Sequence, residues 1–453
     1  MKELNGSSAI ILGYGQEGES AHRYILKHYP DKEIGIADQK NVKPINPNVV
    51  LHTGENYLKK LGDYDVIIRS PGVPYNLPEI KESIKLGKKI TSPTNIFFSE
   101  CLGSIIGITG TKGKSTTASL LSEILKRRYS DVQLVGNIGK PALDFMDDAN
   151  KDTLFVAELS SYQLEDSKYS PHIAVILNVI PEHIEHHGSL QKYIDAKKNI
   201  SLHQTTKDIV VFNPSHKIPS QLASKSPGHK LTFSMKKTDH VFSYIHQDNI
   251  FVKQNRKQHE IIMPVKDIPL LGLGNVENTL AAISVGILLK VPSNDIKKAV
   301  MEFKSLPHRL EFVCERKGIK FYNDSLATIP EAVVNALEAL GENVETLIAG
   351  GYDRGIDFSD LGKYLGKKKG LKTIILFPTT GKKIWKSLSN QISHKELLPD
   401  KYEALSMEDA VQKAFSCTSS GKICLLSPGS PSFGLFRNYE ERGVLFKKLA
   451  LEM

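Results

Sequence analysis

The residues with the clearest chemical pattern form the stretch Gly110-Thr-Lys-Gly-Lys-Ser-Thr116. Glycines let backbone N–H groups approach a phosphate closely, and Lys114 can reach terminal phosphoryl oxygens. The two hydroxyl residues after Lys114 can offer a ligand to Mg²⁺. The match to G-x-x-x-x-G-K-[ST] is imperfect, because Ile108 stands five positions before the second glycine. The stretch predicts binding of ATP or of a closely similar nucleotide.

A predicted strand and a predicted helix must position this loop. Residues 104–109 include three isoleucines in a short apolar run, and apolar residues recur at helical spacing over 118–125. A solvated loop of glycines and lysines is the alternative interpretation. The strand-to-helix context favours the nucleotide site over it.

A second glycine stretch, Gly13-Tyr-Gly-Gln-Glu-Gly18, follows the apolar run Ala9–Leu12. Asp38 lies twenty positions after the last glycine, which is the spacing of a dinucleotide-binding fingerprint. Taken alone, this pattern predicts NAD binding, but a different nucleotide diphosphate fits the same turn. The Pro-containing stretch 91–94 is expected to be a linker to the next unit.

Polar residues follow several later strands. Glu158 comes directly after the predicted strand Thr153–Ala157. A carboxylate at this edge of a sheet that also carries a phosphate loop is a candidate Mg²⁺ ligand, and a strand-end acid in a surface turn is the alternative.

Three histidines and one lysine lie further along the chain. His183, His186 and His187 suggest zinc, but no cysteine or second pair stands nearby at ligand spacing, so His186 and His187 are expected to be solvated. Lys197 lies in a predicted helix over Leu190–Leu202, and its residue type alone predicts a surface position.

The segment 205–265 is interpreted as peripheral strands of the same sheet. A helix with Asn275 and Asn278 on one face of its first turn is expected next. From residue 305 onward, strands alternate with helices, and polar residues collect after each strand. This arrangement predicts another doubly wound α/β sheet with a site at its C-terminal edge.

The composition is that of an ordinary soluble protein. The 453 residues predict two or three domains, with 40% hydrophobic and 24% charged residues. The net charge of +9 comes from scattered lysines interleaved with acids, so no nucleic-acid partner is expected. No secretory signal or membrane-spanning run is evident, and the four cysteines lack metal or redox spacing. A cytoplasmic monomer without membrane insertion is expected.

In combination, these motifs resemble the Mur ligase family, and within it the type that adds glutamate to UDP-N-acetylmuramoyl-alanine. The resemblance covers nearly the whole chain, and its motifs are jointly specific. They are the Gly-Thr-Lys-Gly-Lys-Ser-Thr loop, Asn137-Ile-Gly139, Glu158-Leu-Ser-Ser161, Pro307-His-Arg309, Asn323-Asp-Ser-Leu-Ala-Thr328 and Ser427-Pro428. The resemblance implies three α/β domains: a Rossmann-like UDP-substrate domain over 1–94, a central P-loop ATPase-type domain with peripheral strands over 95–304, and a doubly wound amino-acid-binding domain over 305–453.

The implied reaction is ATP-dependent amide formation. A substrate carboxylate attacks the γ-phosphoryl group to give an acyl phosphate and ADP, and the amine of glutamate then displaces phosphate. The implied partners are UDP-N-acetylmuramoyl-L-alanine, ATP, two Mg²⁺ ions and glutamate, with the D isomer expected. A CO₂-derived carbamate on Lys197 is also implied. An L-glutamate-adding variant and a folylpolyglutamate-synthetase-like ligase are the alternatives.

The resemblance also assigns roles by position. Lys114, Glu158, His183 and Lys197 are the implied catalytic residues, and the implied metal ligands are Ser115, Glu158, His183 and Lys197. ATP binding is implied for Gly110, Thr111, Lys112, Gly113, Lys114, Ser115, Thr116, Asn275, Asn278, Arg309 and Asp324. The UDP substrate is expected to contact Gly15, Gln16, Glu17, Asp38, Gln39, Ser70, Gly72, Asn137 and His183. Glutamate is expected to contact Thr328, Arg354, Ser432 and Tyr439.

The sequence departs from the family pattern in four places. Leu326 stands where the family commonly has lysine, and Gly274 stands where it usually has histidine. Arg354 replaces a lysine found in some members and can bind a carboxylate with two hydrogen bonds. The acid often found after Ser432 is absent. The rival functions are an NAD-dependent oxidoreductase and a non-catalytic or nucleic-acid-stimulated ATPase.

Overall fold

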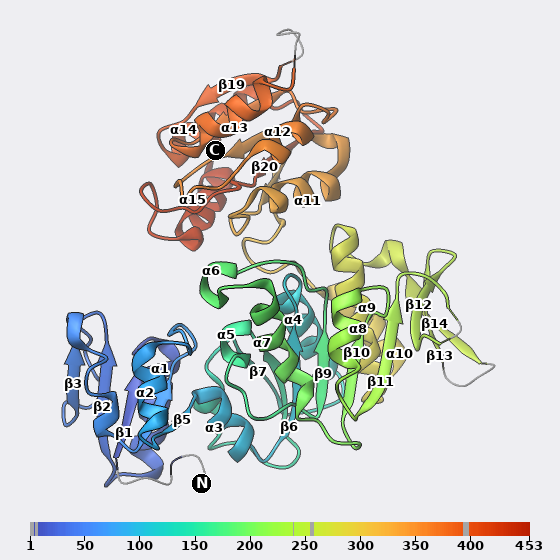
Figure 1. Ribbon diagram of the computed structural model, residues 1–453. Helices are drawn as coiled ribbons and strands as arrows, with labels where there is room; N and C mark the ends of the chain where they lie inside the picture. The colour runs from blue at the N-terminus through green and yellow to red at the C-terminus, as the bar shows by residue number, and fades with distance from the viewer. Residues whose placement is uncertain (1–3, 5–7, 239, 254–257, 393–397) are drawn as a thin grey trace. The chain divides into compact units, whose positions relative to one another are not determined.

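The computed structural model describes residue 4 and residues 8–238, 240–253, 258–392 and 398–453. The chain divides into two compact units. The first comprises Met1–Ile268 and Glu277–Glu302, and the second comprises Pro269–Val276 and Phe303–Met453. The first unit carries two sheets and the second carries one (Figure 1).

The N-terminal sheet, blue in Figure 1, is parallel throughout, with strand order β3-β2-β1-β4-β5. Its elements are β1 (Ser8–Leu12), α1 (Gln16–His28), β2 (Glu33–Asp38), β3 (Val50–Thr53), β4 (Val66–Arg69), α2 (Pro78–Lys85) and β5 (Lys89–Thr91). The central strands β1 and β4 are almost fully buried, as expected of a parallel sheet covered on both faces.

The central sheet has the order β14-β13-β12-β11-β10-β9-β6-β8-β7. Its strands are β6 (Ser104–Thr109), β7 (Val132–Gly136), β8 (Leu154–Glu158), β9 (Ile173–Ile176), β10 (Ile209–Phe212), β11 (His229–Ser234), β12 (Ser243–His246), β13 (Asn249–Lys253) and β14 (His259–Pro264). The strands from β7 to β12 run parallel, and β13 and β14 add an antiparallel edge. The predicted peripheral strands are therefore confirmed as an extension of this sheet.

The helices that accompany the central sheet are α3 (Pro93–Glu100), α4 (Lys114–Leu125), α5 (Ser161–Leu164), α6 (Ile184–His187), α7 (Leu190–Leu202), α8 (Lys217–Ala223), α9 (Leu273–Leu288) and α10 (Ser293–Glu302). The bounds of α7 agree with the prediction. Helix α9 begins in the second unit and ends in the first.

The expected linker over 91–94 is wrong. Thr91 ends β5, and Ser92 caps α3 by accepting a hydrogen bond from the Asn95 N–H at 3.3 Å. Both residues are buried. Serine followed by proline is also the composition of a helix start, which explains why the stretch resembles a linker in the sequence.

The third sheet has the order β15-β16-β20-β17-β18-β19, with only the edge strand β15 antiparallel. Its strands are β15 (Glu311–Arg316), β16 (Ile319–Asn323), β17 (Val344–Ala349), β18 (Thr373–Leu376), β19 (Asp400–Glu403) and β20 (Ile423–Leu426). Its helices are α11 (Pro330–Leu340), α12 (Ser359–Leu365), α13 (Thr380–Ser389), α14 (Met407–Cys417) and α15 (Tyr439–Glu452). Apolar residues of α11 to α13 share one core cluster with the sheet, and those of α14 and α15 share another. The predicted doubly wound α/β architecture is confirmed.

Every helix in the described part of the chain is too short or too polar to cross a lipid bilayer.

Candidate active site

The glycine loop of the central sheet leaves β6 and enters α4 at Lys114. Gly113 caps this helix with a φ of 86°, a value that favours glycine. A Cβ added there would lie 2.1 Å from Asn278 Oδ1. The ammonium of Lys114 donates to the carbonyls of Gly110 and Thr111 at 3.2 and 2.9 Å. Lys114 is therefore hydrogen-bonded to the backbone of its own loop, and Asn278 of α9 packs against Gly113 of that loop.

Thr111 anchors the loop to the segment after β9. Its N–H donates to the Asn178 carbonyl at 2.8 Å, and its hydroxyl donates to the Ile180 carbonyl at 2.9 Å. The same hydroxyl lies 2.9 Å from the Tyr193 hydroxyl. Lys112 next to it forms an exposed ion pair with Glu182. The threonine side chain thus has a positioning role.

Lys197 is one of the most deeply buried polar side chains, with 1% of its surface exposed. The surface position predicted from its residue type is wrong. Its Nζ donates to the Gly110 carbonyl at 2.8 Å and to Thr109 Oγ1 at 3.3 Å. Burial lowers the pKa of this amine well below its usual value, and the charge of Lys114 lowers it further. Burial in this position therefore disfavours the charged form of the amine.

Glu158 ends β8 and is 1% exposed. The Asn137 amide donates to its Oε1 at 2.9 Å. Its Oε2 is buried without a hydrogen-bond partner within the described part of the chain. A buried carboxylate oxygen left in this state is costly unless something binds it. The orphaned oxygen fits a site for a cation.

His183 completes this group from the N-cap of α6, where its backbone is left-handed with a φ of 56°. The side chain of His183 is 45% exposed, and its partial burial lowers the pKa of the imidazole, which the carboxylate of Glu182 opposes and the charge of Lys114 reinforces. A neutral imidazole is the form that ligates metals. The hydroxyl of Ser115, in the first turn of α4, adds a hard oxygen donor. Of the four predicted metal ligands, Glu158 and Ser115 offer the hard oxygen donors that suit Mg²⁺, whereas His183 and Lys197 offer nitrogen atoms.

In the N-terminal sheet, the predicted acid Asp38 accepts hydrogen bonds from the N–H groups of Tyr14 and Lys40 at 2.7 and 2.8 Å. The Ser70 hydroxyl donates to the Gly13 carbonyl at 2.6 Å. Both side chains therefore stabilise the glycine turn. Four further predicted residues keep open or exposed positions around it, namely Gly15, Gln16, Gln39 and Gly72.

Glu17 points away from the turn. Its Oε1 accepts a hydrogen bond from the Gln163 amide at 3.2 Å, and burial raises the pKa of its carboxyl to about 7. The structure thus brings Glu17 to the central sheet's helix α5 rather than to the glycine turn.

Arg69 is a buried residue that sequence reasoning missed. It ends β4, and its guanidinium donates to Asp166 Oδ1 at 2.7 Å and to the Tyr162 carbonyl at 3.0 Å. These contacts fasten the N-terminal sheet to the segment around α5. No local pattern marks the pair, because the two residues lie 97 positions apart.

In the second unit, Asp324 follows β16 and lies between two partners. Its Oδ1 accepts a hydrogen bond from the Leu310 N–H at 3.0 Å, and its Oδ2 accepts one from the Ser427 hydroxyl at 2.9 Å. Burial raises the pKa of this carboxyl to about 7, and the nearby charge of Arg309 acts in the opposite direction. The predicted nucleotide contacts Asp324 and Arg309 therefore share one corner of this unit. Asn275 is partly buried and donates to the Leu271 carbonyl at 2.8 Å.

Three of the four predicted amino-acid contacts occupy loops after the strands, and the fourth begins a helix. Thr328 is partly buried, Ser432 is buried and Arg354 is exposed. Tyr439 begins α15, and burial raises the pKa of its phenol to about 12.

Arg442, which sequence reasoning missed, holds two of these loops together. Its guanidinium donates to the carbonyls of Ser325 and Ser430 at 2.7 and 3.1 Å. The side chain is fully buried. Its position 117 residues after Ser325 leaves no local signal in the sequence.

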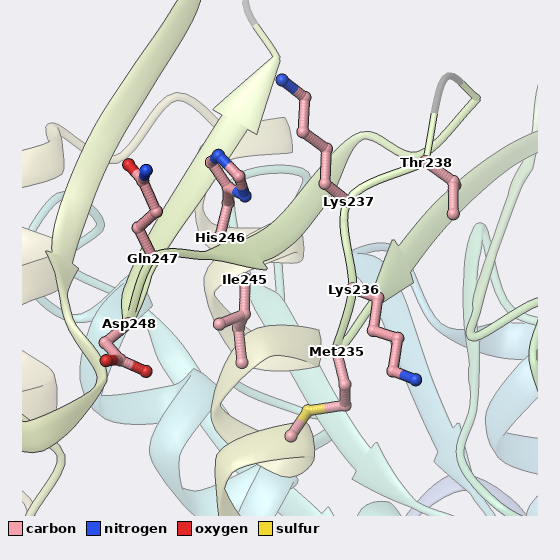
Figure 2. A pocket seen from close by; sticks show the side chains of 8 residues that line it. All are labelled: Met235, Lys236, Lys237, Thr238, Ile245, His246, Gln247 and Asp248. Atoms are coloured by element: carbon pink, nitrogen blue, oxygen red, sulfur yellow. The ribbon is translucent and has the colours of Figure 1, made fainter.

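An open hollow of about 580 Å³ lies elsewhere, along the ends of β11 and β12. It is lined by Met235, Lys236, Lys237, Thr238, Ile245, His246, Gln247 and Asp248. In Figure 2 the side chains of Lys236 and Lys237 point in opposite directions, so the two cations do not converge on one ligand. None of the predicted site residues lines this hollow.

Comparison with known families accounts for most of the chain. Residues 7–92 match the Mur ligase MurD-like N-terminal domain, residues 108–286 the Mur ligase middle domain, and residues 308–429 the Mur ligase glutamate ligase domain.

Relatives that match this chain over its full length share the same protein name. Proteins from Acetivibrio thermocellus, Caldicellulosiruptor bescii and Koribacter versatilis, each named UDP-N-acetylmuramoylalanine–D-glutamate ligase, are 36%, 34% and 32% identical to this chain. The alignments cover 99%, 100% and 100% of this chain and 97%, 99% and 98% of the relatives.

Solved structures share the fold. The UDP-N-acetylmuramate–alanine ligase of Thermotoga maritima is 18% identical with a TM-score of 0.59, over 99% of each chain. MurF from Acinetobacter baumannii is 15% identical with a TM-score of 0.61, over 98% of this chain and 90% of that one. The three matched domains and the full-length relatives lead to one conclusion: this chain belongs to the Mur ligase family.

Proposed function

We propose that this chain joins D-glutamate to UDP-N-acetylmuramoyl-L-alanine with consumption of ATP, a step in the synthesis of peptidoglycan precursors. The observation that carries the proposal is the full-length likeness to relatives named for this reaction. The relatives' name also favours D-glutamate over the L isomer. The buried lysine and carboxylate beside the glycine loop support an ATP-dependent ligase over an oxidoreductase.

The chain's own groups suit the first step. The alanine carboxylate of the UDP substrate attacks the γ-phosphorus of ATP, the bond to the bridging oxygen breaks, and ADP leaves. Lys114 lies in the loop where negative charge accumulates on the transferring group, and the N-terminus of α4 adds its positive end. Mur ligases use Mg²⁺, and a cation held here would neutralise phosphate charge.

In the second step, the amine of glutamate attacks the carbonyl carbon of the acyl phosphate, inorganic phosphate leaves, and the amine loses a proton. We assign recognition of glutamate to four residues of the second unit, Thr328, Arg354, Ser432 and Tyr439. Arg354 offers a planar guanidinium, which suits a carboxylate. The UDP moiety is assigned to the glycine turn of the N-terminal sheet.

We also assign two cations and a carbamate to the site beside the glycine loop. In its uncharged form, which burial favours, the amine of Lys197 can add to CO₂, forming an N–C bond and releasing one proton. The resulting carbamate would be an anionic oxygen donor like Glu158, with His183 and Ser115 as the remaining ligands. The support is the burial of Lys197 and the orphaned Oε2 of Glu158.

A direct assay tests the proposal. The purified chain receives ATP, Mg²⁺, UDP-N-acetylmuramoyl-L-alanine and one amino acid at a time, and phosphate release and product mass are measured. We expect phosphate release with D-glutamate and a product heavier by one glutamyl residue. Product only with L-glutamate, or phosphate release independent of any amino acid, would contradict it. Hydroxylamine should trap the activated acyl group as a hydroxamate.

Two finer points belong to the same proposal. ATP and a nucleotide-linked substrate are found in the cytoplasm, so we propose a cytoplasmic enzyme. We also propose that it acts as a monomer, which analytical ultracentrifugation at the assay concentration would test.

A further inference from the structure

Three potential metal ligands lie close together at the ends of α5 and α6, and the proposed reaction does not use them. Glu165 follows α5, and His186 and His187 form the last turn of α6; both helices pack against α7 (Figure 1). Glu165 Oε2 lies 3.3 Å from His186 Nε2, and Glu165 Oε1 lies 3.7 Å from His187 Nδ1. One ligand atom from each residue falls within 4.8 Å of the others.

His187 supplies a second, independent observation. Only 2% of its surface is exposed, which contradicts the solvated position predicted for it. Its Nδ1 has no hydrogen-bond partner within the described residues, although it faces the carboxylate of Glu165. Its other nitrogen, Nε2, lies 3.0 Å from Ser161 Oγ. A histidine that bonds a fixed group through one nitrogen and directs the other at a carboxylate has the arrangement of an oriented metal ligand.

We propose that Glu165, His186 and His187 bind a divalent first-row transition cation of the zinc class, at a site separate from the one beside the glycine loop. Two imidazoles and one carboxylate suit zinc, and a water would complete the tetrahedron. With metal–ligand bonds near 2 Å, tetrahedral ligand atoms lie about 3.3 Å apart. The distances of 3.3 and 3.7 Å, which run to the two oxygens of the Glu165 carboxylate, are close to that value.

The charges around the cluster permit a cation. Arg69 Nη1 lies 3.9 Å from Glu165 Oε2, but the same guanidinium is bonded to Asp166. One arginine therefore faces two carboxylates, and the charge of Lys197 also acts on His187. The ring of Tyr162 stacks on His187 and lies edge-on to His186, so these rings are held in place. Access is from the side of His186 and Glu165, whose side chains are 15% and 16% exposed.

The test is a zinc titration of the full-length chain, in competition with a chromophoric chelator and in millimolar Mg²⁺. We expect the wild-type chain to bind one equivalent of Zn²⁺. The variants His186→Gln and Glu165→Gln should each bind Zn²⁺ at least about tenfold more weakly than wild type. Co²⁺ should give visible tetrahedral bands in wild type that both variants lose. Glu185→Gln, on the same helix, and His203→Gln, an exposed histidine, serve as matched controls with unchanged affinity.

Equal Zn²⁺ affinity and equal Co²⁺ spectra in wild type and both variants would overturn the proposal, because binding would then occur at the cysteines or beside the glycine loop. Both substituted side chains are partly exposed, and neither is assigned a role in the reaction. Retained Mg²⁺-dependent activity therefore establishes that the variants are folded. Should the ligase assay itself fail, circular dichroism provides that control, so the two proposals can fail separately.

Discussion

The two glycine loops of the first unit have the same local shape and different chemistry. Each follows a buried parallel strand and leads into a helix, β1 into α1 and β6 into α4. In the N-terminal loop, the polar side chains are satisfied internally. Asp38 accepts two backbone N–H groups, and Ser70 donates to a backbone carbonyl. Beside the central loop, the amine of Lys197 is buried, and the Oε2 atom of Glu158 is buried with no hydrogen-bond partner among the described residues.

This difference separates binding from catalysis. A strand, a glycine turn and a helix start are sufficient to receive a phosphate, and both loops have them. Reaction at the phosphate further requires buried charged or nucleophilic groups. The binding of the reactants offsets the desolvation free energy of these groups. Among the described residues, the central loop has two such groups beside it, Lys197 and Glu158, whereas the buried carboxyl of the N-terminal loop, that of Glu17, pairs with Gln163. The predictions below test whether the two loops divide the work in this way.

Lys197→Ala should have the largest effect. Loss of the buried amine, and of the carbamate assigned to it, is expected to lower kcat about 10³-fold or more, because the negative ligand for the cation disappears. Small carboxylates such as formate should restore part of the rate by occupying the same space. The assay is phosphate release at saturating substrates.

Lys198→Ala is the matched control. Its side chain is about one-third exposed and pairs with Asp195, so its removal should leave kcat within about twofold, as for other exposed ion pairs. If Lys197→Ala retained the wild-type rate, the carbamate assignment would be wrong.

Glu158→Gln should lower kcat about 10²-fold and raise the Mg²⁺ concentration needed for half-maximal rate, because an amide is a weaker cation ligand than a carboxylate. Asp38→Asn in the other loop should instead raise the KM for the UDP substrate and leave kcat nearly unchanged. Rate measurements over Mg²⁺ and UDP-substrate concentrations separate the two outcomes. An equal fall in kcat for both variants would show that the two loops do not differ as described.

Much of the fold was predictable from local patterns. The apolar runs predicted the strands, and the helix over Leu190–Leu202 was predicted with the observed bounds. The stretch 91–94 was misjudged because a capped helix start and a linker have similar compositions. The strands and the helix were predicted correctly for one reason: hydrophobic periodicity indicates how each segment packs on its own sheet.

The candidate site was less predictable, because its side chains meet across long sequence separations. Lysine is mostly exposed in proteins and histidine is intermediate, so residue type did not predict the burial of Lys197 and His187, which tertiary packing produces. Glu158 and Asn137 lie 21 positions apart, and their pairing depends on the adjacency of β7 and β8. The family resemblance supplied the roles of most of these residues, and periodicity did not.

Gly113→Ala and Gly15→Ala form a matched pair across the two loops. At position 113, alanine would have a φ of 86° and a Cβ 2.1 Å from Asn278 Oδ1. We expect a loss of about 2 kcal/mol in the free energy of unfolding and a raised KM for ATP. At position 15, φ is −87° and the Cβ meets no atom within 4 Å, so the change should be within about 0.5 kcal/mol.

Urea unfolding of the two glycine variants measures the change in the free energy of unfolding, and ATP titrations of the same variants measure the change in KM. Equal destabilisation at the two positions would mean that the contact between the central loop and α9 contributes little.

Glu17→Gln should have the smallest effect, and it depends on pH. Burial raises the pKa of Glu17 from 4.5 to about 7, so the folded protein holds this proton more tightly than the unfolded chain does. Stability contributed by the group is complete below pH 4.5 and is lost as the pH rises to about 7. The glutamine variant cannot titrate and keeps an amide beside Gln163. Its free energy of unfolding relative to wild type should therefore rise by on the order of 2 kcal/mol across this window. Urea unfolding at pH 5 and pH 7.5 measures the difference; a constant offset between the two proteins would mean that the carboxyl of Glu17 titrates normally and that the N-terminal loop carries no buried ionisable group.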